Sequence, residues 1–203
     1  MSLTGPMADR ALIGGEWVDA RDESRIEVRN PSDDTLIATV PGCGATDTTA
    51  AVDAAHEALT GWRALPGVER ARLLRRLYEL MMRDQERLAE IITLEVGKPV
   101  PESRGEVAYA AGFIEWSAEE AKRIYGESVP ASVADKRIQV LRQPIGVTAA
   151  ITPWNLPSAM ITRKLGPALA AGCTMVVKPA SKTPLSALAL GELAIEAGLP
   201  AGV

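Results

Sequence analysis

The segment 144–203 constrains the fold most, because apolar runs alternate there with helical patterns. The runs are Ile145–Ile151 and Thr174–Lys178, while helical patterns begin near Pro157 and at Pro184. Continuous apolar runs are typical of strands buried on both faces. The order strand, helix, strand, helix predicts the beginning of a parallel α/β sheet. Since two strands cannot form a stable doubly wound sheet, we expect further strands of this domain outside the chain.

Short strands and a helix are predicted near the amino terminus. Strands are expected at Ala11–Ile13, Glu16–Val18 and 35–40, because turn-forming Gly and Pro sequences separate them, and together they predict a small antiparallel sheet. A helix is expected from Thr46, with Asp47 in its first turn as a cap and a partner of the helix dipole.

Two longer patterns of apolar residues at three-and-four spacing follow. One lies between Pro66 and Gly97, and the other begins at Pro101, so we expect two helices that pack together. The next tract, Tyr125 to Gln143, is polar and alternating, which predicts exposed strands that project from the body. Such strand edges are either covered by another subunit or solvated as a hairpin.

The composition excludes several classes of function. With 203 residues, of which 47% are apolar and 24% are charged, the chain has an ordinary globular composition. Its net charge of -4 provides no basic stripe, so no nucleic-acid partner is expected. No apolar run reaches the roughly 18 residues of a membrane span, and residues 1–10 lack the apolar core of a signal peptide. We therefore expect no membrane partner and a cytoplasmic location.

The cysteines and the histidine do not predict a metal site or a nucleophile. Cys43 and Cys173 form no C-x-x-C pair, and His56 is the single histidine, so neither a disulfide framework nor a metal site is expected. Neither cysteine has a basic partner nearby, which favours structural roles in a reducing compartment. The stretch Gly42–Asp47 resembles a dinucleotide fingerprint, but Asp47 stands at the third glycine position and would repel a pyrophosphate. We interpret this stretch as a turn and a helix cap.

Two polar sequences follow the predicted parallel strands, at the end of the sheet where such folds bind ligands. They are Thr152-Pro153-Trp154-Asn155 and Lys178-Pro179-Ala180-Ser181-Lys182. The Asn155 amide can hold an oxyanion, and the Lys178 ammonium can reach the hydroxyls or phosphate of a nucleotide. The alternatives are that Asn155 caps the next helix and that Lys178 is solvated.

Several motifs resemble the aldehyde dehydrogenase superfamily. In chain order they are Leu94-Glu95-Val-Gly-Lys-Pro99, Gln143–Val147, Pro153–Pro157, Gly166–Cys173, Val177–Ala180 and Ala197–Val203. Their order and spacing fit throughout the chain after about residue 10. The stretch Met160–Lys164 looks most like the succinate-semialdehyde dehydrogenase branch.

This resemblance implies an α/β fold with a Rossmann-like coenzyme domain, a β-hairpin oligomerisation arm and a separate catalytic domain. Residues 1–124 would be the amino-terminal strands and helices of the coenzyme domain, 125–143 the arm, and 144–203 the first βαβα part of that domain, incomplete here. The family's glycine motif and its catalytic domain, with the cysteine nucleophile and the glutamate base, would lie outside the chain. The full-length protein would be a homo-oligomer.

The resemblance also implies roles for single residues. In the family a cysteine attacks an aldehyde, the thiohemiacetal delivers hydride to a nicotinamide, and a glutamate activates water. Asn155 would stabilise the thiohemiacetal oxyanion. The coenzyme contacts would come from Thr152, Pro153, Trp154, Asn155, Lys178, Pro179, Ala180 and Ser181. Strictly NAD-dependent relatives often carry glutamate at the position of Ser181, so Ser181, with Lys182 beside it, favours NADP, and NAD is the alternative.

Arg163 indicates the substrate. In the succinate-semialdehyde branch an arginine at this place meets the far carboxylate of the substrate, which a guanidinium binds in bidentate fashion. The expected reaction is therefore oxidation of succinate semialdehyde to succinate, with glutarate semialdehyde as an alternative substrate and a surface arginine as the alternative role. The isolated chain is expected to be inactive. It is either part of a true dehydrogenase or a stand-alone fragment that binds nucleotide weakly or associates with full-length subunits.

Overall fold

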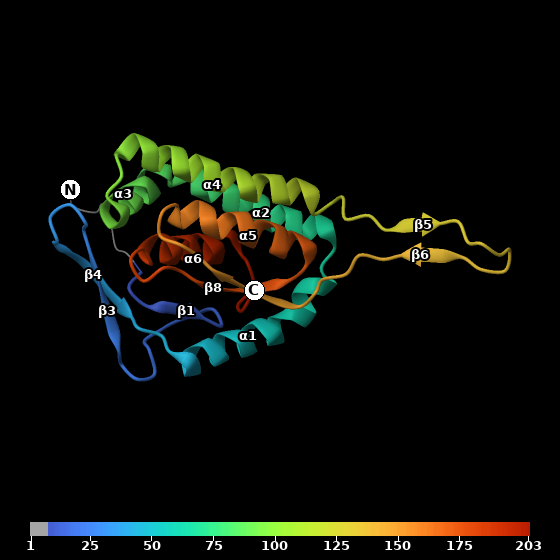
Figure 1. The fold of residues 1–203 in the computed structure, drawn as a ribbon, viewed down its shortest axis with the longest axis horizontal. Coiled ribbons are helices and arrows are strands. Elements are labelled where there is room, and N and C mark those ends of the chain that lie inside the picture. The colour runs from blue at the N-terminus through green and yellow to red at the C-terminus, as the bar shows by residue number, and fades with distance from the viewer. Residues whose placement is uncertain (1–7) are drawn as a thin grey trace.

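The computed structural model describes residues 8–203, which form a mainly helical body and one projecting hairpin (Figure 1). The strands are β1 (Ala11–Ile13), β2 (Glu16–Val18), β3 (Arg25–Arg29), β4 (Leu36–Pro41), β5 (Glu127–Val129), β6 (Ile138–Val140), β7 (Val147–Ile151) and β8 (Thr174–Lys178). The helices are α1 (Ala45–Ala64), α2 (Gly67–Arg83), α3 (Gln85–Val96), α4 (Val100–Glu120), α5 (Pro157–Ala171) and α6 (Leu185–Ala197). Within the described residues, none of these helices combines the length and apolar character needed to cross a membrane.

The amino-terminal strands form two separate hairpins, so the prediction of one small antiparallel sheet is wrong. Among residues 8–203, β1 pairs only with β2, and β3 pairs only with β4. The strand β3 was not predicted, because its sequence RIEVR is charged and only Val28 is buried. β1 instead contacts α1 and α6.

The predicted helix between Pro66 and Gly97 is in fact two helices, α2 and α3, which meet at Asp84. The Asp84 N–H still donates to the Leu80 carbonyl, and the Asp84 carbonyl accepts from the Leu88 N–H. Because the hydrogen bonds and the apolar pattern continue almost unbroken across the junction, no Gly or Pro signal marks it in the sequence. The predicted packing of this region against the helix that follows is confirmed, since α4 contacts both α2 and α3.

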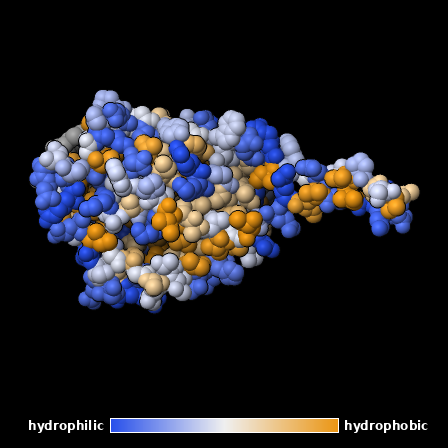
Figure 2. Space-filling model, in the orientation of Figure 1, coloured by the Kyte–Doolittle hydropathy of each residue, from blue (hydrophilic) through white to orange (hydrophobic). Residues whose placement is uncertain are grey.

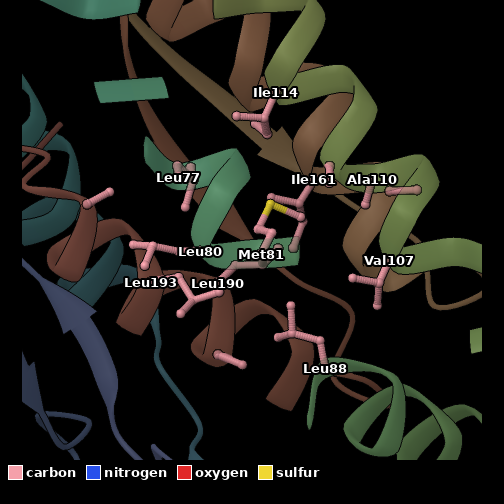
Figure 3. Packing of buried hydrophobic residues seen from close by; sticks show 14 of the residues in the cluster. Leu77, Leu80, Met81, Leu88, Val107, Ala110, Ile114, Ile161, Leu190 and Leu193 are labelled. Carbon is pink, nitrogen blue, oxygen red and sulfur yellow. The ribbon is translucent and has the colours of Figure 1, made fainter. Parts of the chain in front are cut away.

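One continuous apolar core joins the helices. α4 packs against α2, α3 and α5, while α6 packs against α2, α3 and α5. Figure 3 shows Met81 of α2 at the centre of this core, with Ile114 of α4, Ile161 of α5 and Leu193 of α6 around it. These side chains are almost fully buried, so the positions of α4, α5 and α6 relative to one another are fixed by packing.

The hairpin β5–β6 projects far from the body (Figure 1), as expected for residues 125–143. The strands are antiparallel, and every residue of both is exposed. Apolar side chains gather along it (Figure 2); these are Val129, Val133, Ile138, Val140 and Leu141. An exposed hairpin with apolar side chains and free strand edges is a surface that a partner can cover.

β7 and β8 form the predicted parallel pair and lie between α1 and α5 (Figure 1). The expectation that the first of these strands is buried on both faces is wrong. Ile145 is 89% exposed and Ile151 is 76% exposed, and of β7 only Ala150 is buried. The described chain contains a single neighbour for β7, so most of that strand is uncovered.

Candidate active site

The carboxyl ends of β7 and β8 bring the two polar sequences together. The strands are paired so that Ile151 lies opposite Lys178. Immediately beyond this pair, the Thr152 N–H donates to the Lys178 carbonyl with an N···O distance of 3.2 Å. The segments Thr152–Asn155 and Lys178–Lys182 therefore leave the sheet at the same edge, where parallel sheets bind ligands.

Most side chains expected to contact a coenzyme are accessible at this edge. Trp154 is 58% exposed. The other exposed residues are Pro153, Asn155, Lys178, Ser181 and Lys182, whereas Pro179 and Ala180 are half-buried and Thr152 is buried. The Lys178 ammonium donates to the Pro179 carbonyl at 3.1 Å, and among the described residues it has no carboxylate partner. An ammonium with two donors to spare and an accessible hydroxyl at Ser181 suit the hydroxyls and phosphates of a nucleotide.

The Asn155 side chain does not cap α5, which removes that alternative for this residue. The helix begins at Pro157 without a side-chain cap from its preceding residues. Only the backbone carbonyl of Asn155 is engaged, as it accepts a hydrogen bond from the Lys98 ammonium with Nζ···O 3.0 Å. Within residues 8–203 the Asn155 amide group has no partner, so its N–H donors remain available to a ligand.

Glu106 of α4 supplies the missing cap. One of its carboxylate oxygens accepts from the backbone N–H groups of Ser158 and Ala159, at 3.0 and 3.4 Å, and the other pairs with Lys98. The sequence analysis did not predict this contact, because Lys98 appeared there only within a family motif and Glu106 was not singled out. A signal was present: Glu106 precedes Val107 and lies one turn before Ala110, so a carboxylate interrupts the apolar face of the helix.

Glu95 of α3 caps α6 in the same way. Its carboxylate accepts from the N–H groups of Leu185 and Ser186, at 2.8 and 2.9 Å, and from the Ser186 hydroxyl. Burial raises the pKa of Glu95 to about 7, and the nearby Glu106 carboxylate adds to the increase, while the hydrogen bonds from Ser186 and Leu185 oppose it. The two helices that follow β7 and β8 are therefore both capped at their amino termini by a buried glutamate of another helix.

The pKa of Glu95 predicts a pH-dependent stability. The pKa of Glu95 is about 7 in the folded chain and 4.5 as its usual value. Between pH 4.5 and about pH 7, the folded chain therefore holds a proton on Glu95 that the unfolded chain has lost. The contribution of Glu95 is therefore full below about pH 4.5 and falls as the pH rises to about 7, by on the order of 3 kcal/mol. Glu95→Gln should remove this loss in unfolding titrations at pH 5 and pH 7.5. The exposed control Glu57→Gln should behave as wild type, and an equal pH slope in Glu95→Gln would contradict the assignment.

Arg163 lies on α5 beside two aromatic rings of α4. Its Nη2 donates to the Tyr109 hydroxyl at 3.1 Å, and its Cζ lies 4.9 Å from the centroid of the Phe113 ring and 5.6 Å from that of Tyr109. Its Nε is buried without a partner, and no carboxylate of residues 8–203 pairs with the guanidinium. A cation held by aromatic faces, with donors unused, suits an anionic ligand.

Neither cysteine is prepared for nucleophilic attack. Cys173 is buried. Cys43 is exposed, but partial desolvation of its thiol, and next the Asp47 carboxylate, raise the pKa of Cys43. Asp47 accepts from the N–H groups of Gly44 and Arg21, at 2.9 and 3.1 Å, which confirms the interpretation of this stretch as a turn and a helix cap. His56 is exposed on α1, and the described residues contain no cluster of three metal-ligating side chains.

The chain is similar to known proteins over almost its whole length. Residues 17–203 match the aldehyde dehydrogenase family. The chain is 62% identical over 194 residues to succinate-semialdehyde dehydrogenase (NADP(+)) GabD of Escherichia coli K12, and 61% identical over 194 residues to a glutarate-semialdehyde dehydrogenase of Pseudomonas putida. Each alignment covers 96% of this chain and 40% of the relative. The chain thus spans about 40% of the length of these curated relatives.

Solved structures give the same result. A crystal structure described as an E. coli NADP dependent enzyme superposes with a TM-score of 0.96 at 61% identity, over 97% of this chain and 41% of that one.

Proposed function

This chain belongs to the aldehyde dehydrogenase family, and from this premise we propose that it is the amino-terminal part of an enzyme that oxidises succinate semialdehyde to succinate with NADP+, or with NAD+. The observation that carries the proposal is one shared edge that holds the Asn155 amide and the Lys178 ammonium, while the Arg163 guanidinium lies on the helix that starts there. The cysteine nucleophile and the glutamate base would come from the part of the protein outside this chain. The two free cysteines fit a cytoplasmic location.

Asn155 would act on the reacting carbonyl. When the cysteine adds to the aldehyde, negative charge develops on the former carbonyl oxygen, and a fixed amide N–H aimed at that oxygen stabilises the transition state. The Asn155 amide suits this role because its backbone is held by Lys98 while its side chain is unengaged.

Lys178 and Ser181 would bind the adenosine ribose of the coenzyme, whose nicotinamide accepts the hydride when bound. The other contacts would come from Thr152, Pro153, Trp154, Pro179 and Ala180. The Lys178 ammonium can donate to ribose hydroxyls, and the neutral Ser181 with Lys182 beside it accommodates a 2′-phosphate. This arrangement supports NADP as the preferred coenzyme.

Ser181→Glu should reverse the coenzyme preference. A carboxylate at this exposed position repels a 2′-phosphate within a few ångströms, which should lower kcat/KM for NADP+ by at least about tenfold. The value for NAD+ should stay within about threefold, because the ribose hydroxyl can donate to the new carboxylate. Ser181→Gln is the matched neutral control and should retain the wild-type preference. An equal loss in both variants would show that size, and not charge, matters at residue 181.

Arg163 would bind the far carboxylate of the substrate. Its cation lies against Phe113 and Tyr109 without a carboxylate partner in the described residues, which supports an anionic substrate. Relatives named for succinate semialdehyde and for glutarate semialdehyde match the chain almost equally well, at 62% and 61% identity. Succinate semialdehyde is therefore the first substrate to test and glutarate semialdehyde the second.

Residues 125–143 would form the oligomerisation arm, residues 1–124 the amino-terminal part of the coenzyme domain, and residues 144–203 the first βαβα part of that domain. The exposed apolar side chains of the β5–β6 hairpin support a homo-oligomer in which another subunit covers them. The alternative is a non-catalytic fragment that binds nucleotide weakly or associates with full-length subunits. In that case purified chain would bind NADP+ weakly and turn over no aldehyde in any context.

A substrate panel tests the proposal. The extended protein, meaning this chain continued over the remaining length of its relatives, should have a higher kcat/KM for succinate semialdehyde than for butanal, and glutarate semialdehyde should lie between them. Equal values for the charged and uncharged aldehydes would contradict an acid-semialdehyde substrate. Higher activity with glutarate semialdehyde would retain the substrate class and change the substrate.

A further inference from the structure

Lys98 connects α3 to the segment that carries Asn155. α3 ends at Val96, and Gly97 follows it with a φ of 83°. A Cβ at Gly97 would lie only 2.8 Å from Cγ of Pro31, so the position has no room for a side chain. The chain turns sharply there, and the Lys98 ammonium reaches the Asn155 carbonyl at 3.0 Å and the Glu106 carboxylate. The Lys98 side chain is only 13% exposed, so this ion pair is largely shielded from solvent.

Glu106 holds the other end of the same segment. Its side chain is 1% exposed, and it accepts from the N–H groups of Ser158 and Ala159 at the start of α5. Charge-assisted hydrogen bonds are shorter and stronger than neutral ones, and a carboxylate at a helix amino terminus also interacts favourably with the helix dipole. The Asn155 carbonyl is therefore hydrogen-bonded to Lys98, which directly follows Gly97 at the end of α3, and the Ser158 amide is hydrogen-bonded to Glu106 of α4. Lys98 and Glu106 are themselves joined as an ion pair.

We propose that Lys98 and Glu106 are positioning residues for Asn155, an inference that rests on the proposed function. They touch no reacting atom. They hold the backbone at the Asn155 carbonyl and at Ser158 and Ala159, so that the backbone from which the unpaired Asn155 amide extends is already in place when the oxyanion forms. Preorganisation of this kind is costly to lose, because a misplacement of about 1 Å lowers a rate by on the order of 100-fold.

Glu95 provides an internal comparison. It caps α6 through Leu185 and Ser186 as Glu106 caps α5, but no hydrogen bond links it to the segment Trp154–Ser158. A role limited to capping would be shared by both glutamates. A role in positioning Asn155 belongs to Glu106 and Lys98 alone.

The first experiment measures backbone order in this chain by ¹⁵N relaxation. In wild type the amides of Trp154, Asn155 and Leu156 should have order parameters near the value of about 0.85 that marks rigid backbone. In Lys98→Met/Glu106→Gln, whose glutamine can still cap α5, they should fall below about 0.6. Glu95→Gln should leave them unchanged. Order parameters that stay at the wild-type level in the folded double variant would overturn the proposal.

A second double variant covers the case in which the first does not fold. Lys98→Gln/Glu106→Gln keeps a neutral hydrogen-bonded pair, but the glutamine at residue 98 is one bond shorter than lysine and cannot hold the Asn155 carbonyl equally well. The same fall in the three order parameters is expected. Its absence would also overturn the proposal.

The second experiment is a double-mutant cycle in the extended protein. Lys98→Met/Glu106→Gln should lower kcat by about tenfold or more while Asn155 is present, and by less than about twofold in the Asn155→Ala background. The KM for coenzyme should not move by more than about twofold in either background. An equal loss of kcat in both backgrounds would mean that the pair only stabilises the fold. If the wild-type extended protein turns over no aldehyde, the proposed function fails, and the order parameters still decide whether the pair holds the segment.

Discussion

Asn155→Ala is expected to lower kcat of the extended protein by about 100- to 1000-fold, with succinate semialdehyde and saturating coenzyme. Loss of one preorganised oxyanion donor has this effect in acyl-transfer enzymes, and the thiohemiacetal carries its charge on a comparable oxygen. Little of the loss should come from unfolding, because the Asn155 side chain caps no helix and α5 is capped by Glu106. Single-turnover and steady-state measurements of NADPH formation give the rate.

Two variants control this prediction. Gln85→Ala removes a half-buried side chain whose amide donates to the Arg104 carbonyl, away from the candidate active site, and should leave kcat unchanged. Asn155→Asp keeps the shape of the side chain but removes the donor, and should be at least as damaging as alanine. A folded Asn155→Ala protein whose kcat stays within about threefold of wild type would remove Asn155 from the chemistry.

Arg163→Met is expected to lower kcat/KM for succinate semialdehyde by about 100-fold. A guanidinium that binds a carboxylate through charge-assisted hydrogen bonds contributes about 1.5–3 kcal/mol per bond, and each 1.4 kcal/mol corresponds to a factor of ten. Methionine retains an apolar stem against Phe113 and Tyr109, so the packing between α4 and α5 should survive. The loss should appear chiefly in KM, because the far carboxylate does not change during the reaction.

Butanal is the control substrate for Arg163→Met. It lacks the far carboxylate, so its kcat/KM should change by less than about threefold. Arg163→Lys keeps the charge but not the planar fork, and should fall between wild type and methionine with succinate semialdehyde. A loss of similar size with butanal would show that Arg163 supports the fold of α5 and not the recognition of the substrate.

Much of the site's location could be predicted from the sequence. The two apolar runs predict a parallel pair, and parallel strands end at the same edge, so the sequence alone places Asn155 and Lys178 near each other. The projecting hairpin followed from an alternating polar tract. These features follow from local periodicity, which can be identified in a single sequence, and from general rules of sheet topology.

The rest depends on contacts between residues distant in the chain. Nothing local to Glu106 says that its carboxylate meets α5, 52 residues later in the sequence, and Glu95 reaches α6 over 90 residues. The exposure of Ile151 was not predicted either, because an apolar run by itself does not show which neighbours cover the strand. The break at Asp84 leaves no signal, since both helices keep the same apolar face.

The roles proposed for Asn155, Lys178 and Arg163 depend on one claim, that this chain belongs to an acid-semialdehyde dehydrogenase whose nucleophile lies elsewhere in the protein. The most direct measurement is the initial rate of NADPH formation, with NADH in parallel, from succinate semialdehyde by the chain alone and by the extended protein. We predict turnover by the extended protein, faster with NADP+ than with NAD+, and no turnover by the chain alone. Turnover by a pure sample of the chain alone, or a folded extended protein that oxidises no acid semialdehyde, would contradict the claim.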